Sequence, residues 1–129
     1  MIKVLVDSSV WIDFFNGSNP KAKIVSELID NGTICTNDLI LAELLPFIRR
    51  AGETELAQLL KSIPTIPINV NWPGIIDMQF LNLKNGLNKI GIPDLIILQN
   101  VIQNDLHLFS FDKHFKAMSE FQKFKFFGN

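Results

Sequence analysis

Residues 2–15, IKVLVDSSVWIDFF, decide the predicted fold because they place a short β-strand directly before an α-helix. The run IKVLV (2–6) is mostly apolar and partly β-branched, a composition that favours a buried strand. The next residues, DSS (7–9), are of types that often cap a helix, and VWIDFF (10–15) follows them. A strand that leads directly into a helix indicates an α/β fold.

The rest of the chain continues this alternation from end to end. Further strands are predicted at residues 33–36, 66–68, 106–111 and 124–127. Further helices are predicted at residues 21–30, 37–50, 53–63, 72–87, 92–104 and 112–118. Within the helix at 37–50, Pro46 lacks an amide proton and disfavours helical geometry at Leu45, so we expect a kink or an early stop there.

These elements predict a single domain over residues 1–129, without internal repeats or a linker long enough to divide it. The predicted architecture is a three-layer α/β/α sandwich around a mostly parallel sheet, with right-handed crossovers. In such folds, ligands bind at the carboxyl ends of the strands, near the point where the strand order reverses.

The composition is that of a globular protein, with 47% hydrophobic and 19% charged residues. The net charge of -1 gives no general attraction to nucleic acid, so a polyanion would have to be held by a local patch or a bound cation. The single cysteine, Cys35, lies in a predicted strand and is interpreted as a buried thiol. His107 and His114 have no cysteine companion for a zinc site, so we predict that both lie at strand ends or on the surface.

We expect a soluble, cytoplasmic protein that does not enter a membrane. Met1 leads directly into the run at 2–6 without the basic region that opens a secretion signal. No apolar stretch approaches the length of about 20 residues that a membrane-spanning helix needs.

Four acidic residues are predicted to lie near one edge of the sheet. Asp7 and Asp112 directly follow predicted strands. Asp94 opens a helix, and Glu43 lies about one turn into the helix after the second strand. Each position also has a simpler explanation, because Asp7 and Asp112 could cap helices and Asp94 could favour the positive end of a helix dipole.

Glu43 has the most unusual surroundings of the four acids. Its helical neighbours at spacings of three and four cannot pair with a carboxylate, and they are Leu39, Ile40, Pro46 and Phe47. An isolated buried carboxylate is costly and usually becomes neutral. Glu43 is therefore either stabilised by a partner from elsewhere in the fold or directed to solvent between apolar patches.

A group of carboxylates at one rim needs a positive partner. Two such charges about 5 Å apart repel each other by roughly 3 kcal/mol at an effective dielectric constant near 20. No lysine or arginine closely accompanies Asp7, Asp94 or Glu43 in the sequence. Oxygen ligands without histidine or cysteine suit Mg²⁺ or Mn²⁺, and such ions activate water for attack on phosphorus. The pattern therefore indicates phosphodiester hydrolysis.

The order of four segments resembles the PIN-domain nucleases. These segments are VDSSVWID (6–13), LAELL (41–45), IPDLIIL (92–98) and FSFDKHF (109–115). The chain length is similar to that of the VapC-type toxins of bacterial and archaeal toxin-antitoxin pairs. The resemblance implies an endoribonuclease in which four acids surround one or two Mg²⁺ or Mn²⁺ ions, and these acids are Asp7, Glu43, Asp94 and Asp112.

Two hydroxyl residues support the resemblance, and two other residues depart from it. Ser9 and Ser110 stand where that family commonly has serine or threonine, and we expect them to hydrogen-bond to the acids. The departures are Pro46, just after the glutamate motif, and bulky Phe111, just before the last acid. Neither departure removes an acid.

The resemblance also implies a homodimer that is neutralised by a cognate antitoxin protein. The helix at 10–15 carries Trp11, Phe14 and Phe15, more apolar surface than one helix face needs. In the resembling toxins, this region helps to form a groove for the helical tail of the antitoxin. Arg49 and Arg50 are candidates for contacts with the RNA backbone, although they also suit the negative end of a helix dipole.

Other functions stay open at this point. One is a catalytically silent PIN-like module that only binds RNA or protein. Another is a receiver-type phosphoacceptor domain, which needs paired acids after its first strand, whereas DSS (7–9) supplies one. The same gap disfavours a haloacid-dehalogenase phosphatase, which needs two aspartates separated by one residue.

Overall fold

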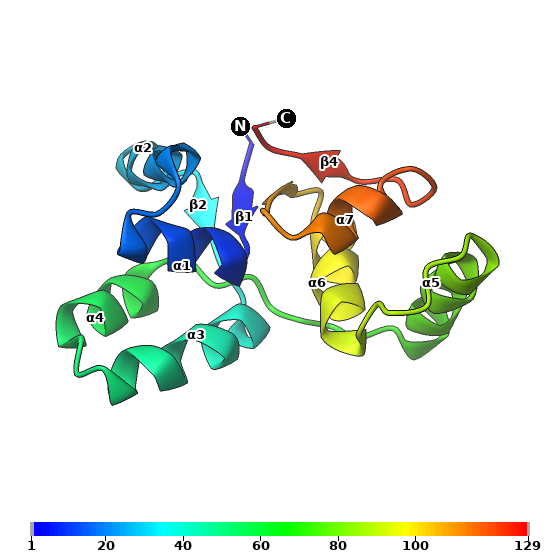
Figure 1. Ribbon diagram of the computed structural model, residues 1–129, viewed down its shortest axis with the longest axis horizontal. Helices are drawn as coiled ribbons and strands as arrows, with labels where there is room; N and C mark the ends of the chain where they lie inside the picture. The colour runs from blue at the N-terminus through cyan, green and yellow to red at the C-terminus, as the bar shows by residue number, and fades with distance from the viewer. Residues whose placement is uncertain (1, 129) are drawn as a thin grey trace.

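Four parallel strands form the centre of the computed structural model, which describes residues 2–128 (Figure 1). The strands are β1 (Val4–Val6), β2 (Ile34–Cys35), β3 (His107–Phe109) and β4 (Lys125–Phe126). Their order across the sheet is β2-β1-β3-β4, and each pairing is parallel. The predicted mostly parallel sheet is confirmed, with strands shorter than the sequence indicated.

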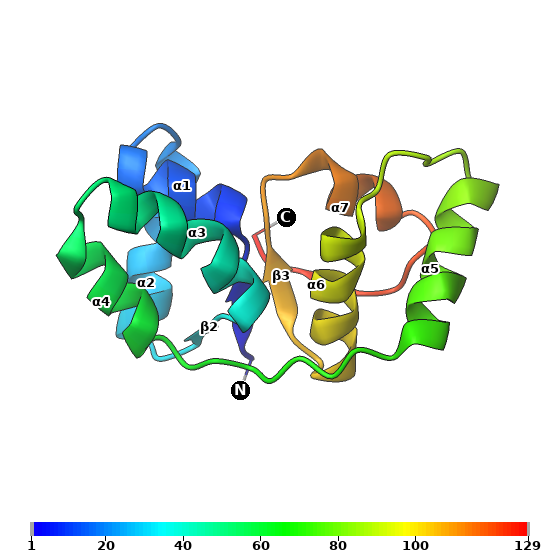
Figure 2. The same cartoon turned by 90° about the horizontal axis from the view of Figure 1, so that it is seen from below.

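Helices flank the sheet on two sides. In both views α1 to α4 lie on one side of the strands and α5 to α7 on the other (Figures 1 and 2). The helices are α1 (Ser8–Asn16), the 3-10 helix η1 (Pro20–Lys23), α2 (Ile24–Asp30), α3 (Asp38–Arg50), α4 (Thr54–Ser62), α5 (Trp72–Lys84), α6 (Ile92–Gln103) and α7 (Lys113–Met118). This is the predicted three-layer α/β/α arrangement. Within residues 2–128, no helix has both the length and the apolar character needed to cross a membrane.

The sheet is buried by the helices around it. All three residues of β1 are fully buried, and Trp11, Leu98 and Phe115 bring large side chains from three helices into the same core. A strand that is covered on both faces does not alternate between polar and apolar residues. This explains the uninterrupted apolar run VLV (4–6). Cys35 is a buried free thiol, as predicted.

The strand order reverses at β1. The chain passes from β1 to β2 on one side, and it then returns to place β3 on the other side of β1. The crevice at such a switch point lies at the carboxyl ends of the two central strands, where open α/β sheets bind their ligands. In this fold, the switch point lies between the carboxyl ends of β1 and β3.

The helix predicted at 37–50 continues through Pro46. The expected early stop is wrong, because α3 extends to Arg50. Pro46 removes one backbone hydrogen bond but lies on the exposed side of α3, whereas Leu44 and Ile48 are buried in the core. Burial of each of these two side chains contributes about 1.5–3 kcal/mol, and the two together exceed the proline penalty of about 3 kcal/mol.

Residues 66–68 do not form the predicted strand. Thr36 makes a single parallel bridge with Thr65, and the amide of Ile66 donates to the Thr36 carbonyl at 2.8 Å. The partner segment leaves the sheet directly after Thr36, because Asn37 caps α3, so the pairing stops after one bridge. The apolar run is therefore part of an extended connection between α4 and α5.

Candidate active site

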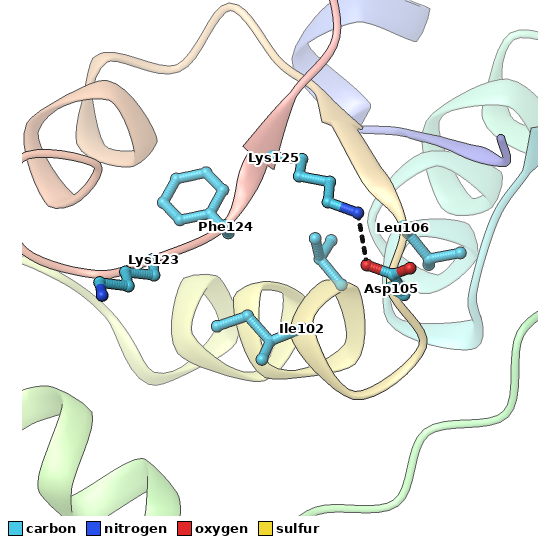
Figure 3. A pocket seen from close by; sticks show the side chains of 7 residues that line it. Ile102, Asp105, Leu106, Lys123, Phe124 and Lys125 are labelled. Carbon is cyan, nitrogen blue, oxygen red and sulfur yellow. Dashed lines mark hydrogen bonds and ion pairs between the residues drawn. The ribbon is translucent and has the colours of Figure 1, made fainter.

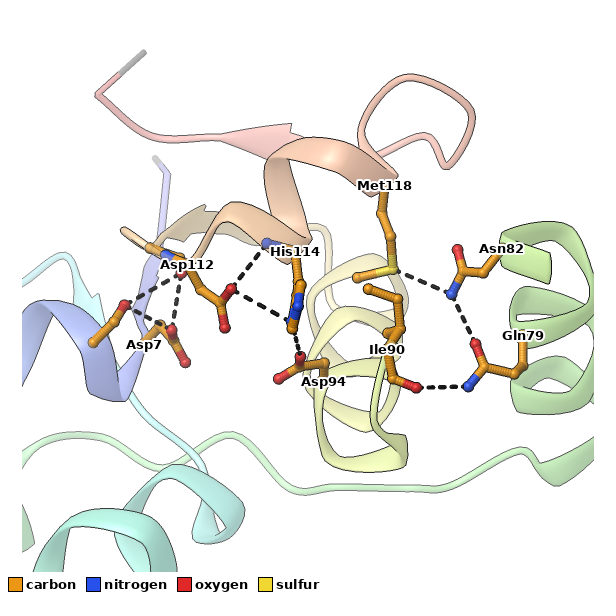
Figure 4. A network of polar contacts seen from close by, with 10 residues as sticks. Asp7, Gln79, Asn82, Ile90, Asp94, Asp112, His114 and Met118 are labelled. Carbon is orange, nitrogen blue, oxygen red and sulfur yellow. Dashed lines mark hydrogen bonds and ion pairs between the residues drawn. The ribbon is translucent and has the colours of Figure 1, made fainter. Parts of the chain in front are cut away.

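Two of the predicted acids lie at the switch point. Asp7 directly follows β1, and Asp112 follows β3 as the cap of α7. Asp94 stands in the first turn of α6, and Glu43 lies on α3. The close view shows Asp7, Asp112 and Asp94 in a row, with His114 between the last two (Figure 4).

Asp7 is the most buried of the four acids, with 4% of its surface exposed. Its Oδ2 accepts hydrogen bonds from Ser9 Oγ and from Ser110 Oγ, each at 2.8 Å. Asp7 occupies the N-cap position of α1, but its side chain makes no capping hydrogen bond, so helix capping does not explain this residue. Burial raises the pKa of Asp7, and the two serine hydroxyls partly oppose that rise.

Ser9 and Ser110 also bind the backbone segment that carries Asp112. Ser9 Oγ accepts a hydrogen bond from Phe111 N at 3.1 Å, and Ser110 Oγ accepts one from Asp112 N at 3.0 Å. The predicted contacts of both serines with the acids are confirmed for Asp7. The two hydroxyls therefore fix the carboxylate after β1 relative to the loop after β3.

Asp112 caps α7 and faces the other acids at the same time. Its Oδ1 accepts a hydrogen bond from His114 N at 2.9 Å, which is N-cap geometry. The His114 ring also turns toward the acids, with Nδ1 at 3.3 Å from Asp94 Oδ2 and 3.6 Å from Asp112 Oδ1. The capping explanation therefore holds for Asp112 without removing it from the site.

Of the two positions predicted for His114, the strand end is wrong, whereas the surface position holds in part, because 34% of the side chain is exposed. The residue is half-buried in α7 and packs its ring between Asp94 and Asp112 (Figure 4). The only local signal was the spacing of two residues from Asp112, which places His114 in the first turn of the helix that Asp112 caps. His107, in contrast, begins β3 and agrees with the prediction.

Glu43 is exposed at the rim of this group, which agrees with the second of the two predicted explanations, a side chain directed to solvent. Its pKa is raised, first by a partial loss of hydration and then by the negative charge of Asp7. The Ser8 hydroxyl opposes the rise, and the charges of Asp94 and Asp112 add to it. Glu43 therefore has no partner on its own helix, but the charges of the other three acids raise its pKa.

The pKa of Asp94 is also raised. Burial raises the pKa of Asp94, the hydrogen bond with His114 lowers it, and the charges of Asp112 and Asp7 raise it. Three carboxyl groups from separate elements thus lose stability as anions because they are close together and partly dehydrated. A bound cation would reverse that effect.

The donor atoms present suit a divalent cation. One ligand atom each from Asp94, Asp112 and His114 lies within 4.8 Å of the other two. Carboxylate oxygens are preferred ligands of Mg²⁺ and Mn²⁺, and imidazole nitrogen is a ligand that transition-metal ions accept. The chemistry of this donor set therefore fits the divalent ion that the resemblance implies.

A separate hollow of about 310 Å³ lies at the amino ends of the strands, away from the acids (Figure 3). Its lining includes Ile102, Leu106 and Phe124, and an ion pair of 2.7 Å joins Lys125 Nζ to Asp105 Oδ1 across it. These residues precede or begin β3 and β4, so they lie at the amino ends of the strands, away from the acids. This hollow is not part of the candidate active site.

The parallel sheet and the acids at its switch point define a class of α/β domain with an acidic cluster at the carboxyl ends of its strands. A comparison with known protein families matches the PIN domain over residues 4–120. The chain therefore belongs to the PIN domain family. No curated protein is similar enough in sequence to count as a match.

Chains from three solved complexes share the fold. One is the DNA-bound VapBC of Salmonella typhimurium, with a TM-score of 0.75, 11% identity and 98% of each chain covered. Another is VapBC2 of Rickettsia felis, bound to a DNA fragment from its promoter, with a TM-score of 0.71, 21% identity and 91% of this chain and 92% of that chain covered. A toxin-antitoxin complex from Klebsiella pneumoniae gives a TM-score of 0.63, 20% identity, and 86% and 88% covered.

Proposed function

We propose that this chain is the toxin of a toxin-antitoxin pair and acts as a Mg²⁺- or Mn²⁺-dependent endoribonuclease. The observation that supports this most strongly is the convergence of acids at the switch point of a PIN domain. These acids are Asp7, Glu43, Asp94 and Asp112. The similar folds found in VapBC and other toxin-antitoxin complexes support the biological role.

In this proposal, the four acids have two roles, which are to bind the ion and to accept a proton. When bound, the ion supplies Lewis-acid activation of a water molecule and neutralises charge on the phosphate. The two serine hydroxyls keep the Asp7 carboxylate in one orientation. Glu43 stands on the solvent side of the group, and its raised pKa suits the transfer of a proton from an attacking water.

The direct test is RNA cleavage with and without a divalent ion. Purified wild-type chain incubated with mixed cellular RNA should produce fragments in Mn²⁺ or Mg²⁺ and none in EDTA. Asp94→Asn should lower the rate at least 100-fold, because it removes one of the ligand charges. Asp77→Asn, at an exposed position on α5, is the matched control and should keep full activity.

The same test separates an enzyme from a silent PIN-like module. Full activity of Asp94→Asn, or cleavage in EDTA, would contradict the proposed mechanism. A folded wild-type chain that binds RNA but cleaves none in either metal would favour the silent module. Activity of Asp94→Asn that is restored by excess Mn²⁺ would still support the metal-ligand role.

The proposed RNA substrate needs positive charge near the acids, and α3 offers two candidates. Arg49 and Arg50 close the same helix that carries Glu43, and both are exposed. A double Arg→Ala substitution should weaken RNA binding and reduce its dependence on salt, because each lost phosphate contact lowers the number of ions released. Unchanged affinity at several salt concentrations would remove both residues from the RNA site.

An apolar groove of about 480 Å³ between α1, α3 and α4 is the proposed antitoxin site. Its lining includes Ile12, Phe15, Leu44, Phe47 and Leu56, and Phe47 is 73% exposed. Trp11, which the sequence suggested for this surface, lies in the core instead. A groove of this kind fits the apolar face of an amphipathic helix.

A second apolar surface, the α5 face, is the proposed homodimer contact. It consists of Trp72, Ile76, Phe80 and Leu83, each more than half exposed. Their spacing puts them on one side of the helix. Together they expose on the order of 400 Å² of apolar surface, about half of what each partner contributes to a standard interface. A second copy of the same face would cover it symmetrically.

A further inference from the structure

We infer that His114 is a direct ligand of the divalent ion and makes the site prefer Mn²⁺ over Mg²⁺. The inference rests on the proposed metal-dependent function and names a ligand beyond the four acids. It concerns the cluster formed by Asp94, Asp112 and His114, whose ligand atoms lie within 4.8 Å of one another. Figure 4 shows the imidazole between the two carboxylates.

The contacts of the His114 ring with the two acids are longer than usual charged hydrogen bonds. The Nδ1 atom of His114 lies 3.3 Å from Asp94 Oδ2 and 3.6 Å from Asp112 Oδ1. Hydrogen bonds between a charged nitrogen and a carboxylate usually measure about 2.7–2.9 Å. Nδ1 also carries at most one proton, so it cannot donate to both acids. The imidazole can therefore donate to only one of the two carboxylates that face it.

A shared cation satisfies all three groups, because each then contributes a lone pair. The elements that carry them are held independently, since Asp94 sits in the first turn of α6 while Asp112 and His114 sit at the start of α7. The backbone of His114 is also fixed, because its amide donates to Asp112 Oδ1 at 2.9 Å. The imidazole is therefore positioned by the fold and not by its contact with Asp94 alone.

Imidazole in the ligand set has a consequence for the choice of ion. Mg²⁺ prefers oxygen ligands and gains little from nitrogen, whereas Mn²⁺ and the later transition-metal ions accept imidazole readily. Replacing His114 by glutamine keeps a polar side chain but removes the nitrogen ligand. We expect this change to weaken Mn²⁺ binding about tenfold and Mg²⁺ binding about twofold or less.

The experiment measures the ligand directly on the full chain loaded with Mn²⁺. Pulsed electron paramagnetic resonance detects a ¹⁴N nucleus bonded to Mn²⁺, and the chain has only two histidines to supply an imidazole. The wild type and His107→Gln should both show the nitrogen coupling, and His114→Gln should lose it. Titrations followed by the free Mn²⁺ signal, with and without competing Mg²⁺, give the affinities.

The possible outcomes separate this inference from the proposed function. A wild-type signal that persists in His107→Gln identifies His114 even if His114→Gln fails to fold. Tight Mn²⁺ binding without any nitrogen coupling would overturn the role of His114 and leave the metal-dependent nuclease intact. Failure of the wild type to bind Mn²⁺ or Mg²⁺ at all would overturn both.

Discussion

At the scale of single residues, Asp7 shows how the site opposes the stability of the fold. It is buried, and its pKa is raised chiefly because burial disfavours the anion. We predict that Asp7→Asn abolishes RNA cleavage but stabilises the metal-free protein at pH 7 by about 0.5–2 kcal/mol, the usual size of a single stabilising substitution. The amide oxygen still accepts from both serine hydroxyls, so the local structure should survive.

The sign of the pH dependence follows from the direction of the Asp7 shift. A carboxyl group whose pKa is raised in the folded state binds more protons there than in the unfolded state, so stability falls as pH rises through the folded pKa. Urea denaturation in EDTA at a series of pH values should therefore show equal stability of wild type and Asp7→Asn in acid, below the ordinary Asp pKa. The advantage of the variant should grow toward neutral pH, and a constant difference would contradict this account.

Ser110 gives a second prediction at this scale. Its hydroxyl donates to Asp7 Oδ2 and accepts from Asp112 N, so it joins the segments after β1 and β3. Ser110→Ala should lower the rate of RNA cleavage about 10- to 100-fold, the usual effect of losing a group that orients a metal ligand. The control Ser119→Ala removes an exposed hydroxyl at the end of α7 and should leave the rate unchanged. Equal rates for both variants would show that Asp7 is held without Ser110.

These residues also show how far local sequence reasoning reaches. Asp7 and Asp112 were found because each directly follows a predicted strand, and that pattern is visible within a few positions of the sequence. His114 was missed because its place depends on Asp94, which approaches from α6. The sequence left two explanations open for Glu43, because its apolar neighbours do not reveal that α3 turns this side toward solvent.

At the scale of elements, a buried amide network joins the helices that carry Glu43 and Asp94. Asn37 caps α3 by accepting from Ile40 N, and its amide group donates to Asn100 Oδ1 at 3.0 Å. Asn100, on α6, in turn donates to the Pro67 carbonyl of the extended connection at 3.0 Å. Both asparagines are almost fully buried. The network therefore ties α3, α6 and the segment between them together.

We predict that Asn100→Ala lowers the free energy of unfolding by about 2–3 kcal/mol. The substitution leaves the Asn37 amide and the Pro67 carbonyl buried without partners, and each unsatisfied group costs about 1–3 kcal/mol. The measurement is equilibrium denaturation in urea. Gln103→Ala is the matched control, because Gln103 lies on the same helix and makes an exposed bond to Asn69 O. The effect of Gln103→Ala should stay within about 0.5 kcal/mol. Similar losses for both variants would show that the buried network does not cause the loss of stability.

The errors in element prediction have related causes. The alternation of strands and helices was predictable because local apolar runs and their spacing indicate each element. The continuation of α3 past Pro46 was not, because the compensating burial of Leu44 and Ile48 depends on the helices that pack against them. The strand expected at 66–68 failed for a similar reason, since a strand exists only where its amides meet a partner.

At the scale of the whole molecule, two apolar surfaces lie at opposite ends of the fold. The groove between α1, α3 and α4 is at one end, and α5 is at the other (Figures 1 and 2). A net charge of -1 gives the chain little electrostatic repulsion against self-association. The two surfaces can therefore serve two partners at once, which the proposed complex of a dimeric toxin with an antitoxin requires.

This separation predicts that the two assemblies fail independently. Phe80→Glu places a charge in the α5 face and should convert the proposed dimer into a monomer, because an isologous contact would bring two such charges together. Phe47→Glu should leave the dimer intact but weaken binding of the cognate antitoxin at least 100-fold, since Phe47 lines the groove and is largely exposed. Sedimentation equilibrium measures the first effect and calorimetric titration the second. A monomeric wild type would remove the α5 contact, and loss of dimer in Phe47→Glu would mean that the groove, and not α5, joins the two copies.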